Sequence, residues 1–233
     1  MFATEVNAVM QISLSESALA EAERLSLEAI CQEDEATQSR LFAEARSALH
    51  NALADEPNNP RLHQMLGLCW YDDPARSDKI RQAIEFHFKM AKQLSPSDPF
   101  PALYLGHFYF DEGRYAEALS LLQQVDDNYF EDIGQKWRIL KNRELILCCR
   151  LYLRPGDITD SELEAICMAY EKADEEDRPA PLEIVICLAT LTDISQEKKR
   201  AMARIVIDLI ESLGYENVFL AQSNYQHLKQ FLL

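Results

Sequence analysis

The segment PFPALYLGHFYFDEGRYAEALSLLQQV, residues 99–125, decides the fold of this chain. At the helical period, its small and apolar residues share one face, namely Ala102, Leu105, Gly106 and Tyr109. Gly106 has no side chain, so a second helix can approach it closely, and Gly113 permits the left-handed conformation that ends the first helix. Ala118 is expected to face Gly106. The segment therefore predicts a tight antiparallel hairpin of two helices.

Two upstream segments repeat this pattern in tandem. The nearer one, residues 60–96, contains Leu66, Gly67 and Trp70, followed by Ala83, Ala91 and Pro96. The farther one, residues 41–57, contains Phe42, Ala45, Leu49, Ala52 and Pro57 at the spacings of a second helix. Residues 73–80 are longer than a short turn and predict a loop or a helix extension. The pattern resembles the tetratricopeptide repeat, and three copies in register indicate an array.

The resemblance implies an all-α fold with a defined architecture. That architecture is an α-solenoid, a right-handed superhelix of antiparallel helix pairs with about ten or eleven helices. A single helical-repeat domain is expected over residues 1–233. Its parts are an N-terminal helix at 13–35, well-matched repeats at 36–130, and degenerate repeats with C-terminal capping helices at 131–233.

The sequence predicts where several helices begin and end. Ser13 with Glu16, and Thr159 with Glu162, match the capping box that opens a helix. A long helix is expected from residue 131 to residue 153, where the residues RPGD break the chain. Further boundaries are expected at Pro179, Pro181 and Gly214.

Composition and charge narrow the possible partners. Only 6 Gly and 9 Pro occur in 233 residues, which favours helices over a turn-rich β fold. The formal charge of −16 opposes binding to nucleic acids and anionic membranes, and it favours a basic partner or simply solubility. The six cysteines lie mostly among apolar residues without a zinc spacing, as in a reducing compartment. With no signal peptide or membrane span apparent, we expect a cytoplasmic protein.

No catalytic motif is apparent, so the chain is not expected to be an enzyme. The His-Glu-x-x-His, Gly-x-Ser-x-Gly and glycine-rich phosphate motifs do not occur. Asp72 and Asp73, with Asp78 nearby, are either a cation site or, as the stronger interpretation, a solvated loop. We accordingly expect no cofactor and no metal.

The family resemblance also implies a concave groove lined by the first helix of each repeat. In the best-matched repeat the groove residues would be Phe100, Leu103, His107 and Phe110, and one repeat earlier they would be Arg61, Gln64, Leu68 and Tyr71. A subset of the family binds a peptide carboxylate through Lys and Asn, and neither occurs at these positions. The alternative is that the aromatic residues pack against later helices of the same chain.

A second candidate site is a basic stripe on the long helix. Lys136, Arg143 and Arg150 are seven residues apart and so lie near one face, and Arg138, Lys141 and Arg154 add to the charge. The stripe could bind an acidic segment or a phosphate. Equally, these cations could pair with acidic helices of the chain itself.

The sequence favours a non-enzymatic scaffold or adaptor that binds another protein or peptide in its groove. The alternative is a dedicated acidic chaperone, inhibitor or immunity-type protein for one basic partner, such as a secreted effector or toxin. Both a monomer and a homodimer remain open. The apolar residues Phe231, Leu232 and Leu233 could pack into the array or seal a dimer.

Overall fold

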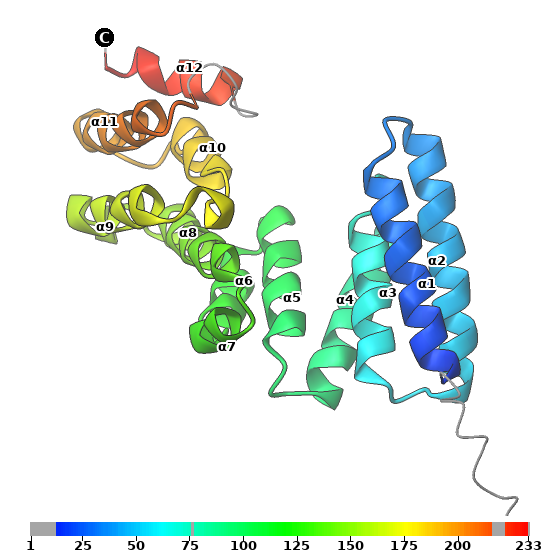
Figure 1. Cartoon of the computed structure of the whole chain (residues 1–233). Coiled ribbons are helices and arrows are strands. Elements are labelled where there is room, and N and C mark those ends of the chain that lie inside the picture. Colours follow the sequence, from blue (N-terminus) through cyan, green and yellow to red (C-terminus); the bar gives the residue numbers. More distant parts are fainter. Residues whose placement is uncertain (1–12, 76, 216–221, 233) are drawn as a thin grey trace, which may run out of the picture. The chain divides into compact units, whose positions relative to one another are not determined.

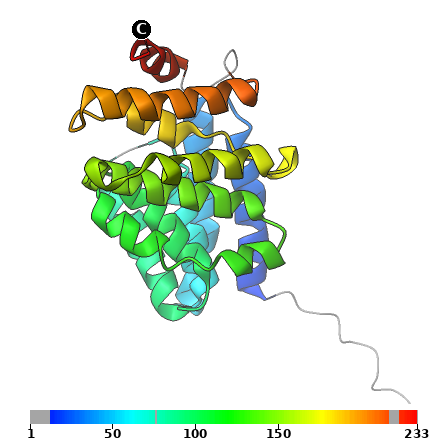
Figure 2. The ribbon, with the colours of Figure 1, turned by 90° about the vertical axis from the view of Figure 1, so that its left-hand side faces the viewer.

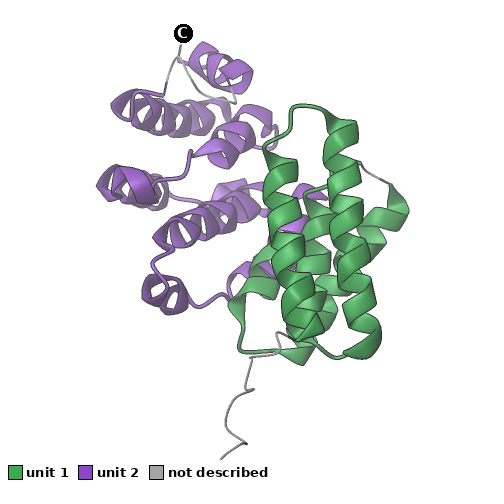
Figure 3. Cartoon of the chain, turned by 45° about the vertical axis from the view of Figure 1, so that its right-hand side comes forward, with its two compact units in different colours: residues 1–105 green, residues 106–233 purple. Residues whose placement is uncertain are grey.

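A computed structural model describes residues 13–75, 77–215 and 222–232 of the chain (Figure 1). These residues form twelve α-helices and two short 3₁₀-helices, and no strand occurs among them. The prediction of an all-helical protein is therefore confirmed. The chain divides into two compact units, residues 1–105 and residues 106–233 (Figure 3).

The first unit is built from helices that pair with their neighbours in sequence. Its four complete helices are α1 (Leu14–Ile30), α2 (Glu35–Asp55), α3 (Pro60–Tyr71) and α4 (Asp78–Leu94). The closest packing joins α1 to α2 and α3 to α4, which form two antiparallel hairpins (Figure 1). The fifth helix, α5 (Pro99–Asp111), contains the boundary between the units.

Side-chain caps fix where the helices of the first unit begin. The predicted capping box is present, since Ser13 Oγ accepts from the Glu16 amide at 3.1 Å and the Glu16 carboxylate accepts from the Ser13 amide. Asp34 and Asn59 cap α2 and α3 through bonds from backbone amides. These contacts satisfy amides that the first helical turn cannot satisfy itself.

Small and aliphatic side chains fill the core of the first unit. The alanines Ala22, Ala29 and Ala45 are fully buried, so α1 and α2 approach closely. Leu41, Leu49, Leu62 and Leu66 occupy the remaining space between the first three helices. Each helix contributes these residues at three- and four-residue steps, as an amphipathic helix requires.

The helices of the second unit lie in stacked layers (Figure 2). They are α6 (Tyr115–Leu122), α7 (Asp127–Asp132), α8 (Lys136–Leu153), α9 (Asp160–Lys172), α10 (Leu182–Thr190), α11 (Gln196–Ser212) and α12 (Gln222–Gln230). The most extensive packing joins every second helix, with α8 against α6 and α10, α10 against α12, and α9 against α11. Their shared core runs from Leu140 to Leu228.

One helix boundary differs from the prediction. The long helix expected from residue 131 begins instead at Lys136, and residues 127–132 form the separate helix α7. Gly134 adopts φ of +68°, the left-handed conformation, and so ends α7. This break accounts for a described helix count of twelve rather than ten or eleven. The predicted breaks at Gly113 and Gly214, with φ of +72° and +70°, are confirmed.

The close approach predicted at Gly106 is real, but the opposing residue is different. A Cβ on Gly106 would lie 2.6 Å from Cδ2 of Leu122, so Leu122 rather than Ala118 is the nearest side chain. Gly67 has the same role in the first unit, where a Cβ would lie 2.7 Å from the ring of Phe88. In both hairpins the glycine makes room for a large side chain of the following helix.

The C-terminal residues pack within their own unit. Phe231 and Leu232 are partly buried against the core of the second unit, and Leu233 lies outside the described residues. Five cysteines are buried as expected, whereas Cys31 is exposed at the end of α1. None of the described helices combines the length and the apolar character needed to cross a membrane.

Candidate protein-binding surface

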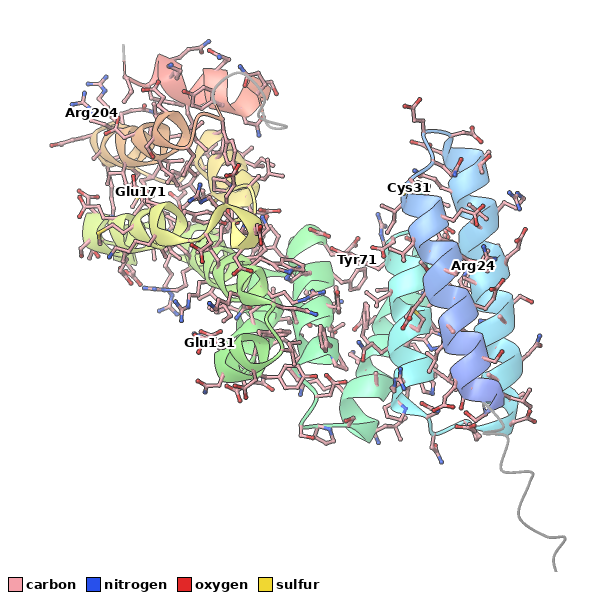
Figure 4. The ribbon with its side chains drawn as sticks, in the orientation of Figure 1. Arg24, Cys31, Tyr71, Glu131, Glu171 and Arg204 are labelled. Atoms are coloured by element: carbon pink, nitrogen blue, oxygen red, sulfur yellow. The ribbon has the colours of Figure 1, made fainter. Side chains whose placement is uncertain are left out.

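The predicted groove residues of α3 lie on its partly exposed face. Arg61 is exposed, and the side chains of Gln64, Leu68 and Tyr71 are partly exposed. Steps of three and four residues place all four on one face of the helix. The opposite face of α3 is fully buried and carries Leu62, Leu66 and Cys69. α3 is thus fixed through one face, and it presents a mixed apolar and polar stripe on the other, with Tyr71 at its C-terminal end (Figure 4).

The groove residues predicted on α5 lie in several environments. Leu103 is only 1% exposed and belongs to the core, so its side chain is closed to a partner. Phe100 is partly exposed and stacks on Tyr104, with the ring centroids 6.3 Å apart. The remaining two residues, His107 and Phe110, lie on the part of α5 that belongs to the second unit.

Phe110 joins an aromatic cluster inside the second unit. Its ring lies 5.5 Å from that of Tyr115 and 6.2 Å from that of Tyr152, and the two tyrosines stack at 4.2 Å. Tyr152 also forms a hydrogen bond of 3.0 Å with Thr190 through the hydroxyl groups. Phe110 packs against the core of its own unit. Phe110 therefore packs against helices of its own chain, which was the alternative to a place in the groove.

His107 is held in its neutral form by its surroundings. Burial lowers the pKa of His107 to about 3, and the positive charges of Lys141 and Arg138 lower it further. The residue is thus a neutral polar group at neutral pH. Lys141 and Arg138 both belong to α8 and are cations that the sequence analysis counted with the basic stripe.

The basic stripe is largely an internal ion-pair network. Arg143 lies 2.8 Å from Asp127 and Arg150 lies 2.8 Å from Glu162, so two of its three principal members pair with neighbouring helices. Lys136 is exposed and makes no ion pair with any residue that the structure describes. Both pairs are substantially exposed, so each contributes about 0–1 kcal/mol to stability.

Glu144 is a buried carboxylate of the second unit that the sequence did not mark as a candidate site. Its buried carboxylate accepts hydrogen bonds from the Tyr170 hydroxyl at 2.8 Å, the Ile184 amide at 3.0 Å and Lys141 Nζ at 2.9 Å. Lys141 also pairs with Glu183. Burial and the charge of Glu144 raise the pKa of Tyr170. Glu144 thus ties α8 to α9 and α10.

The acidic loop after α3 is not solvated throughout. Asp73 is 1% exposed and pairs with Arg46 at 2.8 Å, although Asp72 beside it is exposed. Ser39 and the Ala75 amide also donate to Asp73, at 2.7 and 3.0 Å. The expectation of a solvated loop was therefore wrong for Asp73, because an arginine 27 residues earlier neutralises it. The guanidinium also covers the Trp70 ring at 3.8 Å.

Three histidines gather in the first unit. Nδ1 of His63 lies 3.0 Å from Nδ1 of His87, so one ring donates to the other, and His63 Nε2 lies 3.1 Å from the Pro57 carbonyl. The ring of His50 lies 5.9 Å from that of His87. Burial lowers the pKa of His87 to about 4, and neighbouring His63 and His50 add to the shift.

The described residues show two features that bear on reactive chemistry. They contain no group of three or more His, Cys, Asp or Glu side chains placed to hold a metal ion. Burial raises the pKa of the Cys149 and Cys167 thiols to about 12, which makes them poor nucleophiles. Comparison of the chain with protein-family models, curated proteins and solved structures found no match.

Proposed function

We propose that this chain is a non-enzymatic scaffold or adaptor that binds another protein through the open face of α3. The observation that carries the proposal is the partly exposed stripe Gln64, Leu68 and Tyr71 on a helix whose other face is buried. Because the backbone of such a helix is already ordered, only its side chains lose freedom on binding. The stripe combines an aliphatic, an aromatic and an amide side chain, a mixture typical of protein interfaces.

The helix pairs support this proposal through the resemblance to tetratricopeptide repeats. Stacked helical hairpins of that family form a right-handed superhelix with extended concave surfaces that seldom carry chemistry. The pairing of α1 with α2 and of α3 with α4, helices that follow one another in sequence, supports this resemblance. A cytoplasmic location and the absence of nucleic-acid binding are part of the same proposal.

A capture experiment with a matched pair of variants tests this function. Tagged wild-type protein is expected to retain a protein partner from the native host, and Leu68→Asp is expected to lose it. Ile30→Asp places the same charge at an exposed apolar residue of α1 and serves as the control. Circular dichroism must show that both variants are folded. Equal retention by folded Leu68→Asp and wild type would overturn the assignment to α3.

A second candidate is the dedicated acidic partner of one basic protein. The observation that favours it is the charge of residues 14–55, where nine carboxylates face three arginines for a net charge of −6. All nine carboxylates are exposed, whereas Arg46 is buried. An electrostatic field of one sign accelerates the association of an oppositely charged partner protein, and added salt weakens this acceleration. One captured partner with a salt-sensitive association rate would support this function over a scaffold with several partners.

A further inference from the structure

The C-terminal end of α8 lines a hollow of about 290 Å³ in the second unit. Its lining residues come from α6, α8 and the turn that follows, and they are Leu119, Gln123, Arg150, Leu153, Arg154 and Asp157. Leu153 is 43% exposed, and Leu119 is partly exposed. A volume of this size can receive an aliphatic side chain of a partner. The two leucines supply the apolar contacts for it.

Two guanidinium groups border the same hollow. Arg154 is exposed and makes no side-chain hydrogen bond or ion pair with any described residue. Arg150 uses one nitrogen in its pair with Glu162, and a guanidinium has five N–H donors. Asp157 is the one carboxylate in the lining, so the lining carries a net charge of +1 in a chain whose charge is −16. The hollow is therefore complementary to a carboxylate beside an aliphatic group.

The cations of α8 extend this surface along the helix. Arg143 and Lys136 are seven and fourteen residues before Arg150 and lie on the same face. At 1.5 Å per residue, seven residues span roughly 10.5 Å, which an extended peptide covers in about three residues. The pair of Arg143 with Asp127 is exposed, so a carboxylate from a partner can replace it at little cost.

We propose that this face of α8 binds an acidic peptide segment of a partner, with an aliphatic side chain of that segment seated between Leu119 and Leu153. The inference rests on the proposed protein-binding function and adds a second recognition surface with a stated chemistry. Arg154 and Arg150 hold the carboxylate next to the aliphatic residue. Arg143 and Lys136 receive carboxylates farther along the peptide.

The probe is a labelled peptide, Glu-Ser-Ser-Glu-Leu-Ser-Glu, acetylated and amidated so that every carboxylate belongs to a side chain. Fluorescence anisotropy with the full chain is expected to show saturable binding that weakens with salt. Arg154→Glu is expected to weaken it about tenfold, since a hydrogen bond between charged groups contributes that much to affinity. Leu153→Ser should weaken it less, because it removes only the apolar contact.

Matched controls separate this site from general charge effects. Arg204→Glu makes the same charge change at an exposed residue of α11 (Figure 4) and should leave the affinity unchanged. A peptide with Lys in place of Glu, or with Ser in place of Leu, should bind more weakly than the probe. Arg154 has no described side-chain partner, so Arg154→Glu is expected to remain folded, which circular dichroism checks.

Three outcomes would overturn the inference. In the first, the acidic peptide does not bind to the wild-type chain. In the second, it binds to Arg154→Glu as tightly as to wild type. In the third, a single-stranded oligonucleotide binds more tightly than the peptide and displaces it. None of them bears on capture of a partner through Leu68. A chain that retains its partner but ignores the acidic peptide would keep the proposed function and lose this site.

Discussion

The first unit pairs helices that follow one another in sequence, whereas the second packs every second helix together. In the first unit, small residues allow neighbouring helices to pack closely. Gly67 of α3, for example, leaves room for the ring of Phe88 on α4. In the second unit, the carboxylate of Glu144 joins α8 to residues 26 and 40 positions away. The difference shows that hairpins can be specified by local spacing, while layers of alternate helices require specific distant partners.

Each unit also contains a buried carboxylate that is paired with a cation. Arg46 and Asp73 form this pair in the first unit and hold α2 to the end of α3. Glu144 with Lys141 forms it in the second. The two tryptophans, Trp70 and Trp137, fall one in each unit, so Trp137→Phe and Trp70→Phe backgrounds allow each unit to be followed separately.

The largest expected effect follows from removing the carboxylate of Glu144. Glu144→Ala leaves the Tyr170 hydroxyl and the Ile184 amide buried without their acceptor, and it removes one of the two carboxylates that pair with Lys141. Breaking a buried charge centre costs about 3–5 kcal/mol. In urea titrations, the transition of Trp137 is expected to move to lower urea, and that of Trp70 to move much less.

Glu144→Gln provides the control for side-chain shape. It keeps one acceptor oxygen but turns an amide donor towards groups that donate, so its effect should be intermediate. An equal shift of both tryptophan transitions would show that the units unfold together. An unchanged Trp137 transition would contradict the role assigned to Glu144.

Local features of the chain could be predicted from the sequence. The capping boxes at Ser13 and Thr159 and the left-handed glycine at 113 are confirmed, because each depends on residues within a few positions. The break at Gly134 was missed although the glycine was visible, since a continuous helical pattern surrounds it. The nearest neighbour of Gly106 was placed one helical turn too early, at Ala118 instead of Leu122.

The candidate surfaces were harder to predict for a physical reason. Exposure and pairing depend on contacts across the chain, as with Asp73 and Arg46, which are 27 residues apart. The same holds for Arg143 and Arg150, whose partners Asp127 and Glu162 lie on other helices. The family resemblance implied groove positions for Leu68 and Leu103 alike, and it did not distinguish the partly exposed side chain of Leu68 from the buried one of Leu103.

The next largest expected effect is a difference in stability loss between Gly67→Ala and Gly106→Ala. Gly67→Ala places a methyl group 2.7 Å from Phe88, a buried ring that stacks on Tyr104 at 5.9 Å and has little room to move. Gly106→Ala meets the end of the Leu122 side chain, which can rotate. Overpacking costs about 1–3 kcal/mol, so Gly67→Ala should lie near the upper end and Gly106→Ala near the lower.

Gly156→Ala is the matched control for both substitutions. An added Cβ there meets nothing within 4 Å, so the midpoint of unfolding should stay close to wild type. The midpoints are measured with Trp70 for the first unit and Trp137 for the second. A larger loss for Gly106→Ala than for Gly67→Ala would mean that Leu122 is the more rigid neighbour.

The smallest expected effect is the pH dependence that His87 gives to the first unit. His87 has a pKa of about 4 in the folded chain against an ordinary value of 6.5, so the unfolded chain binds the extra proton between these values. The free energy of unfolding is therefore expected to fall as the pH falls from about 6.5 to about 4, by roughly 1–2 kcal/mol between pH 7 and pH 5. The measurement is the urea midpoint of the Trp70 transition at a series of pH values.

Two histidine variants show whether this dependence belongs to His87. His87→Gln removes the titrating group and should flatten the pH dependence of the Trp70 transition, even if it lowers stability at neutral pH. His227→Gln changes an exposed residue of α12 in the second unit and should leave the dependence unchanged. If the slope persists in His87→Gln, another group carries it, and the first candidate is His50, whose pKa burial also lowers. Because His63 and His87 share one hydrogen bond between their Nδ1 atoms, protonating both would leave two donors facing each other at 3.0 Å.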